Sequence, residues 1–194
     1  MLVKKVQPET CQVPATNHSP NSKLPVIVYR DALINKTPEG AQEAVETSAW
    51  INGGHWKIQK DSLAGTSHYH SITHEAYTVL HGNATYLLGR SPLDNEIDEN
   101  GNPVGVVFKA SEGDVFVLPA GVSHFVTDTE DGYEILGFYS LSEHNSHEQP
   151  YDMHYGRRSV EDTEAMRKDI EKVSVPMVDP IYGERGPMQE IWRG

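Results

Sequence analysis

The stretch HYHSITHEAYTVLHG, residues 68–82, decides the fold class and the kind of site that this chain contains. Side chains alternate between the two faces of a β-strand, so His68 and His70 share one face and Tyr69 takes the other. Glu75 follows shortly afterwards and would arrive with the next strand. Imidazole and carboxylate groups together suit Fe(II), Mn(II), Ni(II), Co(II), Cu(II) or Zn(II). The stretch therefore predicts that His68, His70 and Glu75 bind one divalent transition-metal ion.

A second stretch, GDVFVLPAGVSH at residues 113–124, supplies a further histidine. The Gly-Asp pair at its start predicts a turn into a strand, and Pro119 with Gly121 predicts a tight turn at the end of that strand. This second turn fixes where His124 enters the following strand. We predict His124 as the third imidazole of the same metal site, supplied from a distant part of the chain.

Short strands with turn residues between them surround these two stretches. Many short strands separated by Gly, Pro, Asn and Asp indicate an antiparallel sandwich or barrel. The acidic run at 91–103, which contains Asn100 and Gly101, predicts a solvated surface loop with a turn. The strands are expected at residues 24–29, 55–59, 66–70, 76–80, 84–88, 104–109, 115–118, 124–127 and 133–139.

Helices and irregular chain are expected toward the two ends. A threonine followed by a proline predicts the start of a short helix over 38–47. A capping box that begins at Ser159, followed by apolar residues at helical spacing, predicts a helix over 160–173 that packs against the barrel. The last stretch, 175–194, is rich in proline and glycine and is expected to wrap the surface as irregular chain.

The chain is expected to form a single domain without an internal repeat. Residues 1–25 are polar and punctuated by prolines, which indicates an extended N-terminal arm outside the core. Residues 26–142 would form the barrel with its preceding strand and helix, and residues 143–194 would form the C-terminal helix and wrapping tail of the same domain. The expected class is therefore all-β, with one short N-terminal and one C-terminal helix.

The composition of the chain argues against several classes of function. Its 194 residues include 16 Lys and Arg against 28 Asp and Glu, a formal net charge of −12 at pH 7. This charge would repel nucleic acid and anionic membrane surfaces, and no apolar run approaches the ~18 residues of a membrane helix. Cys11 is the one cysteine, so no intramolecular disulfide can form. With a polar N-terminus that lacks a signal-peptide core, these features predict a cytoplasmic protein.

The two stretches together resemble the motifs of the cupin superfamily, G-x5-H-x-H-x3–4-E-x6-G and G-x5-P-x-G-x2-H-x3-N. The resemblance implies a single jelly-roll β-barrel with one metal ion inside, held by three histidines and one glutamate. Carried over by position, these ligands fall on His68, His70, Glu75 and His124.

The chain departs from these motifs at two positions. Ser62 stands where the first motif begins with glycine, with Gly65 nearby, which would alter only a turn. Asp128 stands where the second motif ends with asparagine, at an expected turn position. Neither departure removes a metal ligand, so metal binding is expected to persist.

A narrower resemblance extends over nearly the whole chain. The segments LPVIVYRDAL, HYHSITHE, LPAGVSH and YDMHYG and the DPIYG-x2-GP ending are similar to those of the YjlB-type cupins of bacteria and fungi. Cupin barrels commonly pair through their terminal extensions, so the resemblance also implies a homodimer.

Residues near the predicted ligands are candidates for a substrate pocket. If the strand after Glu75 is unbroken, alternation brings Tyr77 and His81 to the inward face, and we predict both as pocket residues. His74 would face the opposite way, either as a structural residue or as a partner that orients a ligand. Further histidines in the polar stretch after the last strand are expected at the surface, and they are His144, His147 and His154.

The predicted ligand set indicates a function without defining the reaction. Four protein ligands on a metal that accepts six leave two positions for a small-molecule substrate, alone or with O2. We favour a dioxygenase that cleaves an enol- or phenol-like compound, with Glu75 as metal ligand and, if it loosens from the metal, as catalytic proton acceptor. The alternatives are a non-oxidative decarboxylase, isomerase or dehydratase, and a non-catalytic protein that binds a metal or small ligand. The fold cannot choose among them, because one fold supports many reactions.

Overall fold

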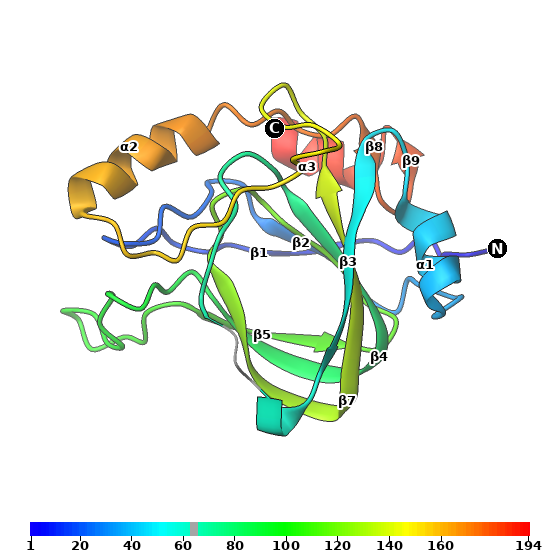
Figure 1. Cartoon of the computed structure of the whole chain (residues 1–194), viewed down its shortest axis with the longest axis horizontal. Coiled ribbons are helices and arrows are strands. Elements are labelled where there is room, and N and C mark those ends of the chain that lie inside the picture. The colour runs from blue at the N-terminus through cyan, green and yellow to red at the C-terminus, as the bar shows by residue number, and fades with distance from the viewer. Residues whose placement is uncertain (63–65) are drawn as a thin grey trace.

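The strands that carry the motif residues belong to one antiparallel sheet that curls on itself (Figure 1). The computed structural model describes residues 1–62 and 66–194. The strands of this sheet are β1 (Glu9–Cys11), β2 (Val26–Tyr29), β3 (Trp50–Ile58), β4 (Glu75–Leu88), β5 (Val106–Ser111), β6 (Val115–Leu118) and β7 (His124–Ser140). Within the described residues the strand order is β1-β2-β6-β4-β7-β3, and β5 pairs with β4. This arrangement confirms the all-β jelly-roll class.

Two long strands, β4 and β7, form the centre of the sheet and pair with each other along most of their length. Each joins two segments that the sequence predicts as separate strands, so those predicted breaks are wrong. Gly82 and Gly132 both have φ of 71° and bend the chain without ending the strand. The register between β4 and β7 shifts on both sides of His81, as a β-bulge would produce.

The strands predicted at 24–29, 55–59 and 104–109 are confirmed with shifted ends. The strand predicted at 115–118 is confirmed at both ends as β6, and β3 begins at Trp50, before the predicted start. At 66–70 the structure has isolated bridges in place of a strand. These bridges belong to the site and are described with it.

The sheet has an apolar core on each of its faces. All four residues of β6 are buried, because alternate side chains enter different cores. Phe116 and Leu118 lie in the inner core, while Val115 and Val117 lie in an outer core that also contains Trp192 from the C-terminal end. A strand buried on both faces reads as a continuous apolar run, which is why β6 shows no alternation in the sequence.

The C-terminal end is ordered, so the prediction of irregular chain over 175–194 is wrong. It contains β8 (Val178–Asp179), β9 (Gly183–Glu184) and helix α3 (Pro187–Arg193). Trp192 of α3 is buried, and its indole N–H donates to the backbone oxygen of Pro25 at 2.9 Å. The tail therefore covers the outer core as an integral part of the fold.

One buried carboxylate, Asp179, fastens this tail to the sheet. It accepts a hydrogen bond from the hydroxyl of Tyr29 in β2. It also accepts from the backbone N–H groups of Ile181, Tyr182 and Met188, at 2.8, 2.9 and 3.0 Å respectively. Asp179 therefore satisfies several buried donors at once.

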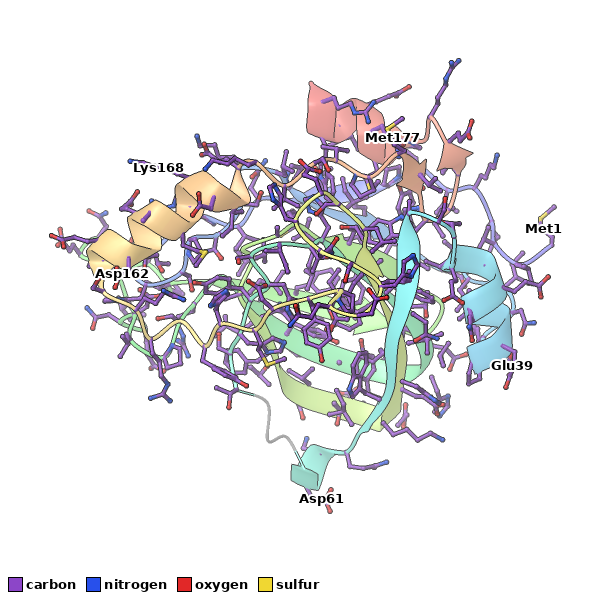
Figure 2. The ribbon with its side chains drawn as sticks, turned by 45° about the horizontal axis from the view of Figure 1, so that its top comes forward. Met1, Glu39, Asp61, Asp162, Lys168 and Met177 are labelled. Carbon is purple, nitrogen blue, oxygen red and sulfur yellow. The ribbon has the colours of Figure 1, made fainter. Side chains whose placement is uncertain are left out.

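The two predicted helices are confirmed as α1 (Pro38–Val45) and α2 (Val160–Ile170), each shorter than expected at its C-terminal end. The Ser159 side chain accepts from the N–H of Asp162 at 3.1 Å, which is the predicted cap. Ile170 packs with Tyr69 and Ala120 in a small apolar cluster. Figure 2 shows the exposed Asp162 on the outer side of the molecule. None of the helices in the described residues is long and apolar enough to cross a membrane.

The N-terminal arm takes part in the core, contrary to the prediction for residues 1–25. Strand β1 pairs with β2, and Val13 is 3% exposed within the inner core. Asn21 is also buried, donates to the backbone oxygen of Gly89 at 2.9 Å and accepts from the N–H of Ser123 at 3.2 Å. The arm thereby supports the turn immediately before His124.

Candidate metal centre

His68 and His124 are held side by side by the backbone. The N–H of His124 donates to the oxygen of His68 at 2.9 Å, and the N–H of His68 donates to the oxygen of His124 at 3.3 Å. Their rings lie with centroids 4.5 Å apart. This local bridge, in place of the strand predicted at 66–70, brings a residue from before β4 to the first residue of β7.

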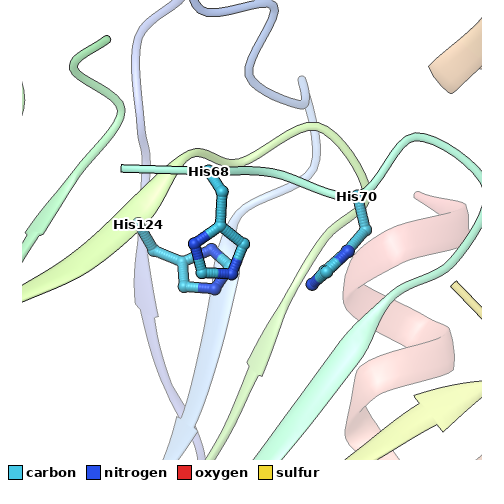
Figure 3. A group of neighbouring side chains, drawn as sticks. All are labelled: His68, His70 and His124. Atoms are coloured by element: carbon cyan, nitrogen blue, oxygen red, sulfur yellow. The ribbon is translucent and has the colours of Figure 1, made fainter. Parts of the chain in front are cut away.

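The three histidine side chains predicted as ligands converge in the barrel, and Glu75 lies beside two of them. One ring nitrogen from each of His68, His70 and His124 lies within 4.8 Å of the other two, and Figure 3 shows the three rings together. Oε2 of Glu75, the first residue of β4, lies 3.2 Å from Nε2 of His70 and 3.3 Å from Nε2 of His124. The structure thus brings together all four predicted residues.

Hydrogen bonds to the backbone determine the tautomer of each histidine. Nδ1 of His68 contacts the oxygen of Thr66 at 3.0 Å, and Nδ1 of His124 contacts the oxygen of Val122 at 3.0 Å. Nδ1 of His70 contacts the oxygen of Asp152. A backbone carbonyl can only accept, so each Nδ1 carries a proton, and each Nε2 presents a lone pair when its ring is neutral.

Two of the converging atoms have unsatisfied hydrogen-bonding capacity. Nε2 of His70 and Oε2 of Glu75 are buried and have no hydrogen-bond partner among the described residues. Two acceptors 3.2 Å apart need a positive charge between them, either a proton on His70 or a metal ion. With the lone pairs of His68 and His124 also present, the donor set fits a divalent transition metal.

Burial and neighbouring charges shift the pKa values of the converging residues in different directions. Burial, together with the neighbouring His124, lowers the pKa of His68 to about 4, so this ring is neutral. Burial acts to raise the pKa of Glu75, but His70 and His124 outweigh it and hold the pKa well below its usual range. Burial acts to lower the pKa of His70, but Glu75 outweighs it and raises the pKa. A metal ion would therefore compete with a proton for Nε2 of His70.

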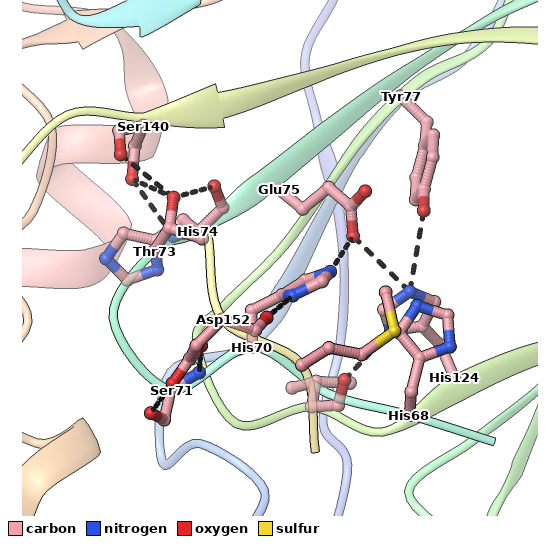
Figure 4. A network of polar contacts seen from close by, with 12 residues as sticks. His68, His70, Ser71, Thr73, His74, Glu75, Tyr77, His124, Ser140 and Asp152 are labelled. Atoms are coloured by element: carbon pink, nitrogen blue, oxygen red, sulfur yellow. Dashed lines mark hydrogen bonds and ion pairs between the residues drawn. The ribbon is translucent and has the colours of Figure 1, made fainter. Parts of the chain in front are cut away.

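A cavity of about 360 Å³ opens beside three of these four residues, His68, Glu75 and His124. Among its polar groups, the hydroxyl of Tyr77 lies 3.5 Å from Nε2 of His124 (Figure 4). Burial, followed by the negative charge of Glu75, raises the pKa of both Tyr77 and Tyr139 well above the usual range. Both hydroxyls therefore keep their protons at neutral pH. The lining consists of Trp56, Ile58, Thr66, His68, Glu75, Tyr77, Tyr86, His124, Phe125, Val126, Ile135, Tyr139, Tyr151 and Met153.

Tyr77 lies in this lining as predicted, whereas the prediction for His81 is wrong. The His81 side chain is 59% exposed and pairs with Glu112, with Nδ1 3.0 Å from the carboxylate. The bulge in β4 reverses the alternation, so inward residues have odd numbers up to Val79 and even numbers from Ala84. His81 falls between the two runs and points outward.

The two departures from the motifs, at Asp128 and at Ser62 with Gly65 nearby, leave the ligands in place. Asp128 lies within β7, and it is half-buried and paired with Lys60 at 3.0 Å, in place of the predicted turn position. Gly65, the alternative to Ser62 as first glycine of the motif, lies outside the described residues. Neither point alters the ligand set.

Sequence reasoning missed Tyr139, Tyr151 and Met153, which line the cavity. Tyr139 continues the odd-numbered inward run of β7 that includes Tyr133 and Ile135, so the period-2 pattern contains a signal for it. Tyr151 and Met153 lie in the segment YDMHYG, which has no secondary-structure signal. His154 in the same segment is only 17% exposed and pairs with Asp152, so its prediction as a surface residue is wrong, whereas His144 and His147 are exposed.

His74 has a structural role next to the site. It is fully buried, its Nδ1 accepts from the N–H of Ala120 at 3.0 Å, and its ring lies 4.7 Å from that of Trp192. Its other nitrogen contacts the backbone oxygen of Ser174 at 3.3 Å. His74 therefore joins the turn before His124 to the C-terminal tail.

We expect the metal-free protein to lose stability in mild acid because of His74. Burial lowers the pKa of this imidazole from 6.5 to about 4 in the folded chain. Its contribution is complete above pH 6.5 and is lost between pH 6.5 and 4, where only the unfolded chain binds the proton. His74 alone should lower the free energy of unfolding by about 3 kcal/mol over this range, and His68, whose pKa is also lowered to about 4, adds to the fall.

Urea denaturation of the metal-free protein at several pH values measures this effect. His74→Asn keeps an acceptor near the N–H of Ala120 but cannot titrate, so its stability should depend less steeply on pH. His81→Asn, which removes an exposed imidazole, is the matched control and should behave as the wild type. An equally steep dependence in His74→Asn would refute this assignment.

Comparisons with known proteins place the chain in a family. The sequence model of the family described as Cupin matches residues 62–153, which contain all four converging residues. The YjlB protein of Bacillus subtilis is 32% identical over 169 residues, covering 87% of this chain and 86% of that protein. The chain belongs to the cupin superfamily, and over most of its length it is similar to YjlB.

Solved structures resemble the chain only distantly. A dTDP-4-dehydrorhamnose 3,5-epimerase from Elizabethkingia anophelis is 11% identical with a TM-score of 0.41, covering 71% of this chain and 76% of that chain. Vicilin from Corylus avellana (hazelnut) is 18% identical with a TM-score of 0.36, and the match covers 60% of this chain. The chain spans 28% of the length of that vicilin.

Proposed function

We propose that this protein is a metal-dependent enzyme that acts on a small molecule, and that it cleaves an enol- or phenol-like compound with O2. One observation carries the proposal. The buried and unsatisfied atoms Nε2 of His70 and Oε2 of Glu75 meet two further imidazoles, from His68 and His124, beside a cavity of about 360 Å³. Buried polar atoms are normally hydrogen-bonded, so such a cluster points to a function.

A divalent metal ion held by these four residues would supply Lewis acidity and two positions at which a substrate oxygen and O2 are brought together. The protein contributes the proton chemistry. Glu75 is ionised, and in this proposal it accepts the proton of a substrate hydroxyl as that oxygen becomes anionic. The hydroxyls of Tyr77 and Tyr139 keep their protons, so they can donate hydrogen bonds to the anionic oxygen.

The cavity lining supports a flat substrate with little negative charge. Aromatic rings from Trp56, Tyr77, Phe125, Tyr139 and Tyr151 dominate it, and it contains no Lys or Arg among the described residues. Aromatic walls pack well against planar compounds, whereas phosphorylated substrates would need cationic side chains. A compound with one or two enol or phenol oxygens fits this combination.

Turnover in air and under argon tests the proposal. The purified protein, loaded in turn with Fe(II), Mn(II), Ni(II) and Cu(II), is supplied with a panel of catechols, enediols and 2-keto acids. We expect O2 to be consumed in step with substrate, turnover to stop under argon, and Glu75→Ala to fall to background while His81→Ala is unaffected. Turnover that continues unchanged under argon would overturn the dioxygenase proposal and support a non-oxidative Lewis-acid enzyme. Ligand uptake without product in either atmosphere would indicate a binding protein.

We also propose, from the resemblance to other cupins, that the enzyme is a cytoplasmic homodimer that pairs through its terminal extensions. Sedimentation equilibrium of the full chain tests the dimer. A mass of one chain, 21.6 kDa, at all concentrations would refute it.

A further inference from the structure

Residues 151–154, here called the strap, cross the metal centre after the last strand of the barrel. The strap's Asp152 accepts a hydrogen bond from Nδ1 of His70 through its backbone oxygen. The ring of Tyr151 stacks on Tyr139 with centroids 4.5 Å apart, and lies edge-on to His70 at 5.4 Å. Met153 and Tyr151 both line the cavity. The strap therefore touches one of the converging histidines and also closes the cavity beside it.

Polar contacts fasten the strap to the segment that carries His68 and His70. The Asp152 carboxylate accepts from the N–H of Ser71 at 2.7 Å and from the hydroxyl of the same residue, as Figure 4 shows. The carboxylate also lies 2.7 Å from Nε2 of His154. Asp152 thus contacts the ring of His70 through its backbone oxygen and Ser71 through its carboxylate.

Backbone pairing completes the attachment. The N–H of Tyr69 donates to the oxygen of His154 at 2.9 Å, and the N–H of His154 donates to the oxygen of Tyr69 at 3.0 Å. The ring of His154 stacks on that of Tyr69, with centroids 5.1 Å apart. The strap is therefore fixed directly to residues 69–71, and its position sets the position of the carbonyl that His70 contacts.

This fastening contributes little to the apolar core. Tyr151 and Met153 are 40% and 41% exposed, and neither belongs to an apolar cluster of the described residues. An exposed segment held by several polar contacts gains little stability from burial. The fastening of the strap acts locally on His70, because a histidine ligand is oriented by the group that accepts from its second ring nitrogen.

We propose that Asp152 is a positioning residue for the metal centre, which holds the strap so that its backbone oxygen orients His70 with Nε2 toward Glu75. The proposal rests on the proposed metal function. Without the Asp152 carboxylate, the strap would lose its hydrogen bonds to Ser71 and to the ring of His154, and its carbonyl would be held less firmly although the backbone pairing with Tyr69 remains. The ring of His70 could then rotate, and a bound metal would lose part of one ligand's contribution.

Titration of the metal-free protein with Co(II) tests this role. Affinity is measured by competition with a chelator, and ligand geometry by the visible absorption of bound Co(II). We expect Asp152→Ala to weaken Co(II) binding by about 10–100-fold, as for other residues that orient metal ligands, and to change the Co(II) spectrum. Asp152→Asn keeps an oxygen acceptor for Ser71, so its affinity and spectrum should lie between those of Asp152→Ala and the wild type.

Asp94→Ala is the matched control. Asp94 fastens the loop after β4 to the N-terminal arm, with its carboxylate accepting from the hydroxyl of Thr16 at 2.6 Å and from the N–H of Ser91 at 2.8 Å. Its loss removes similar hydrogen bonds away from the converging residues. We expect this variant to bind Co(II) with wild-type affinity and spectrum, although its melting temperature falls.

The possible results separate the two proposals. Co(II) binding by the wild type with unchanged affinity and spectrum in Asp152→Ala would overturn the role of Asp152 alone. Equally weakened Co(II) binding in Asp94→Ala would also overturn the role of Asp152, because the loss of affinity would then not depend on the strap. A wild-type protein that binds no Co(II) would overturn the metal centre and the strap's role with it. If Asp152→Ala fails to fold, as judged by circular dichroism, the Co(II) affinity and spectrum of Asp152→Asn and Ser71→Ala test the role of Asp152 instead.

Discussion

We expect His124→Ala to lower the affinity for Co(II) by more than about 100-fold, which exceeds the effect expected for a residue that only orients a ligand. The substitution removes one of four converging donors, and it also removes a partner 3.3 Å from Oε2 of Glu75. Three remaining groups no longer form a prepared site for an octahedral ion. Elemental analysis of the protein purified without an affinity tag should show the same loss.

The fold of His124→Ala should survive, because the inner core on both sides, including Val122 and Val126, remains in place. His81→Ala is the control, since it removes an exposed histidine from outside the cavity and should leave metal affinity unchanged. Retained affinity in His124→Ala would contradict the proposed ligand set. If the wild-type protein unfolds when its metal is removed, the metal is structural and the enzyme proposal fails.

The second large effect is expected for Asp179→Ala, which should lower the free energy of unfolding by about 3–5 kcal/mol. Asp179 is 1% exposed and accepts from the hydroxyl of Tyr29 and from the N–H groups of Ile181, Tyr182 and Met188. Each buried donor that loses its acceptor costs about 1–3 kcal/mol, and relaxation of the tail recovers part of this.

Guanidinium denaturation with fitted midpoint and slope measures this loss. Asp169→Ala is the control, because Asp169 is exposed and pairs with Lys172 of the same segment, at 2.7 Å. A surface pair of this kind contributes less than about 1 kcal/mol. Equal stability of Asp179→Ala and Asp169→Ala would show that Asp179 does not fasten the C-terminal tail.

The converging residues could be predicted from the sequence because their signals are local. His68 and His70 alternate along an extended segment, and the tight turn at Pro119 and Gly121 places His124 at the start of the next strand. Period-2 alternation and turn chemistry depend on residues within a few positions of one another. The same reasoning located β6 and the starts of α1 and α2.

The sequence pattern was insufficient to predict structure that depends on contacts between residues far apart in the chain. The expectation for His81 assumed an unbroken strand, and the bulge at Gly82 arises from the pairing of β4 with β7. The order of the C-terminal tail depends on Asp179 reaching Tyr29, a residue 150 positions away. Neither contact has a signal within a short window of sequence.

The sequence by itself determined the all-β class, the family resemblance and the identity of the four converging residues, since these follow from the spacing of residue types along the chain. Only the tertiary structure decided the tautomers of the histidines, the aromatic lining of the cavity and the strap over His70. Each of these requires groups far apart in sequence to meet, as when the oxygen of Asp152 accepts from Nδ1 of His70. The physical reason is that hydrogen bonding and packing act between neighbours in space, and strand alternation acts between neighbours in the chain.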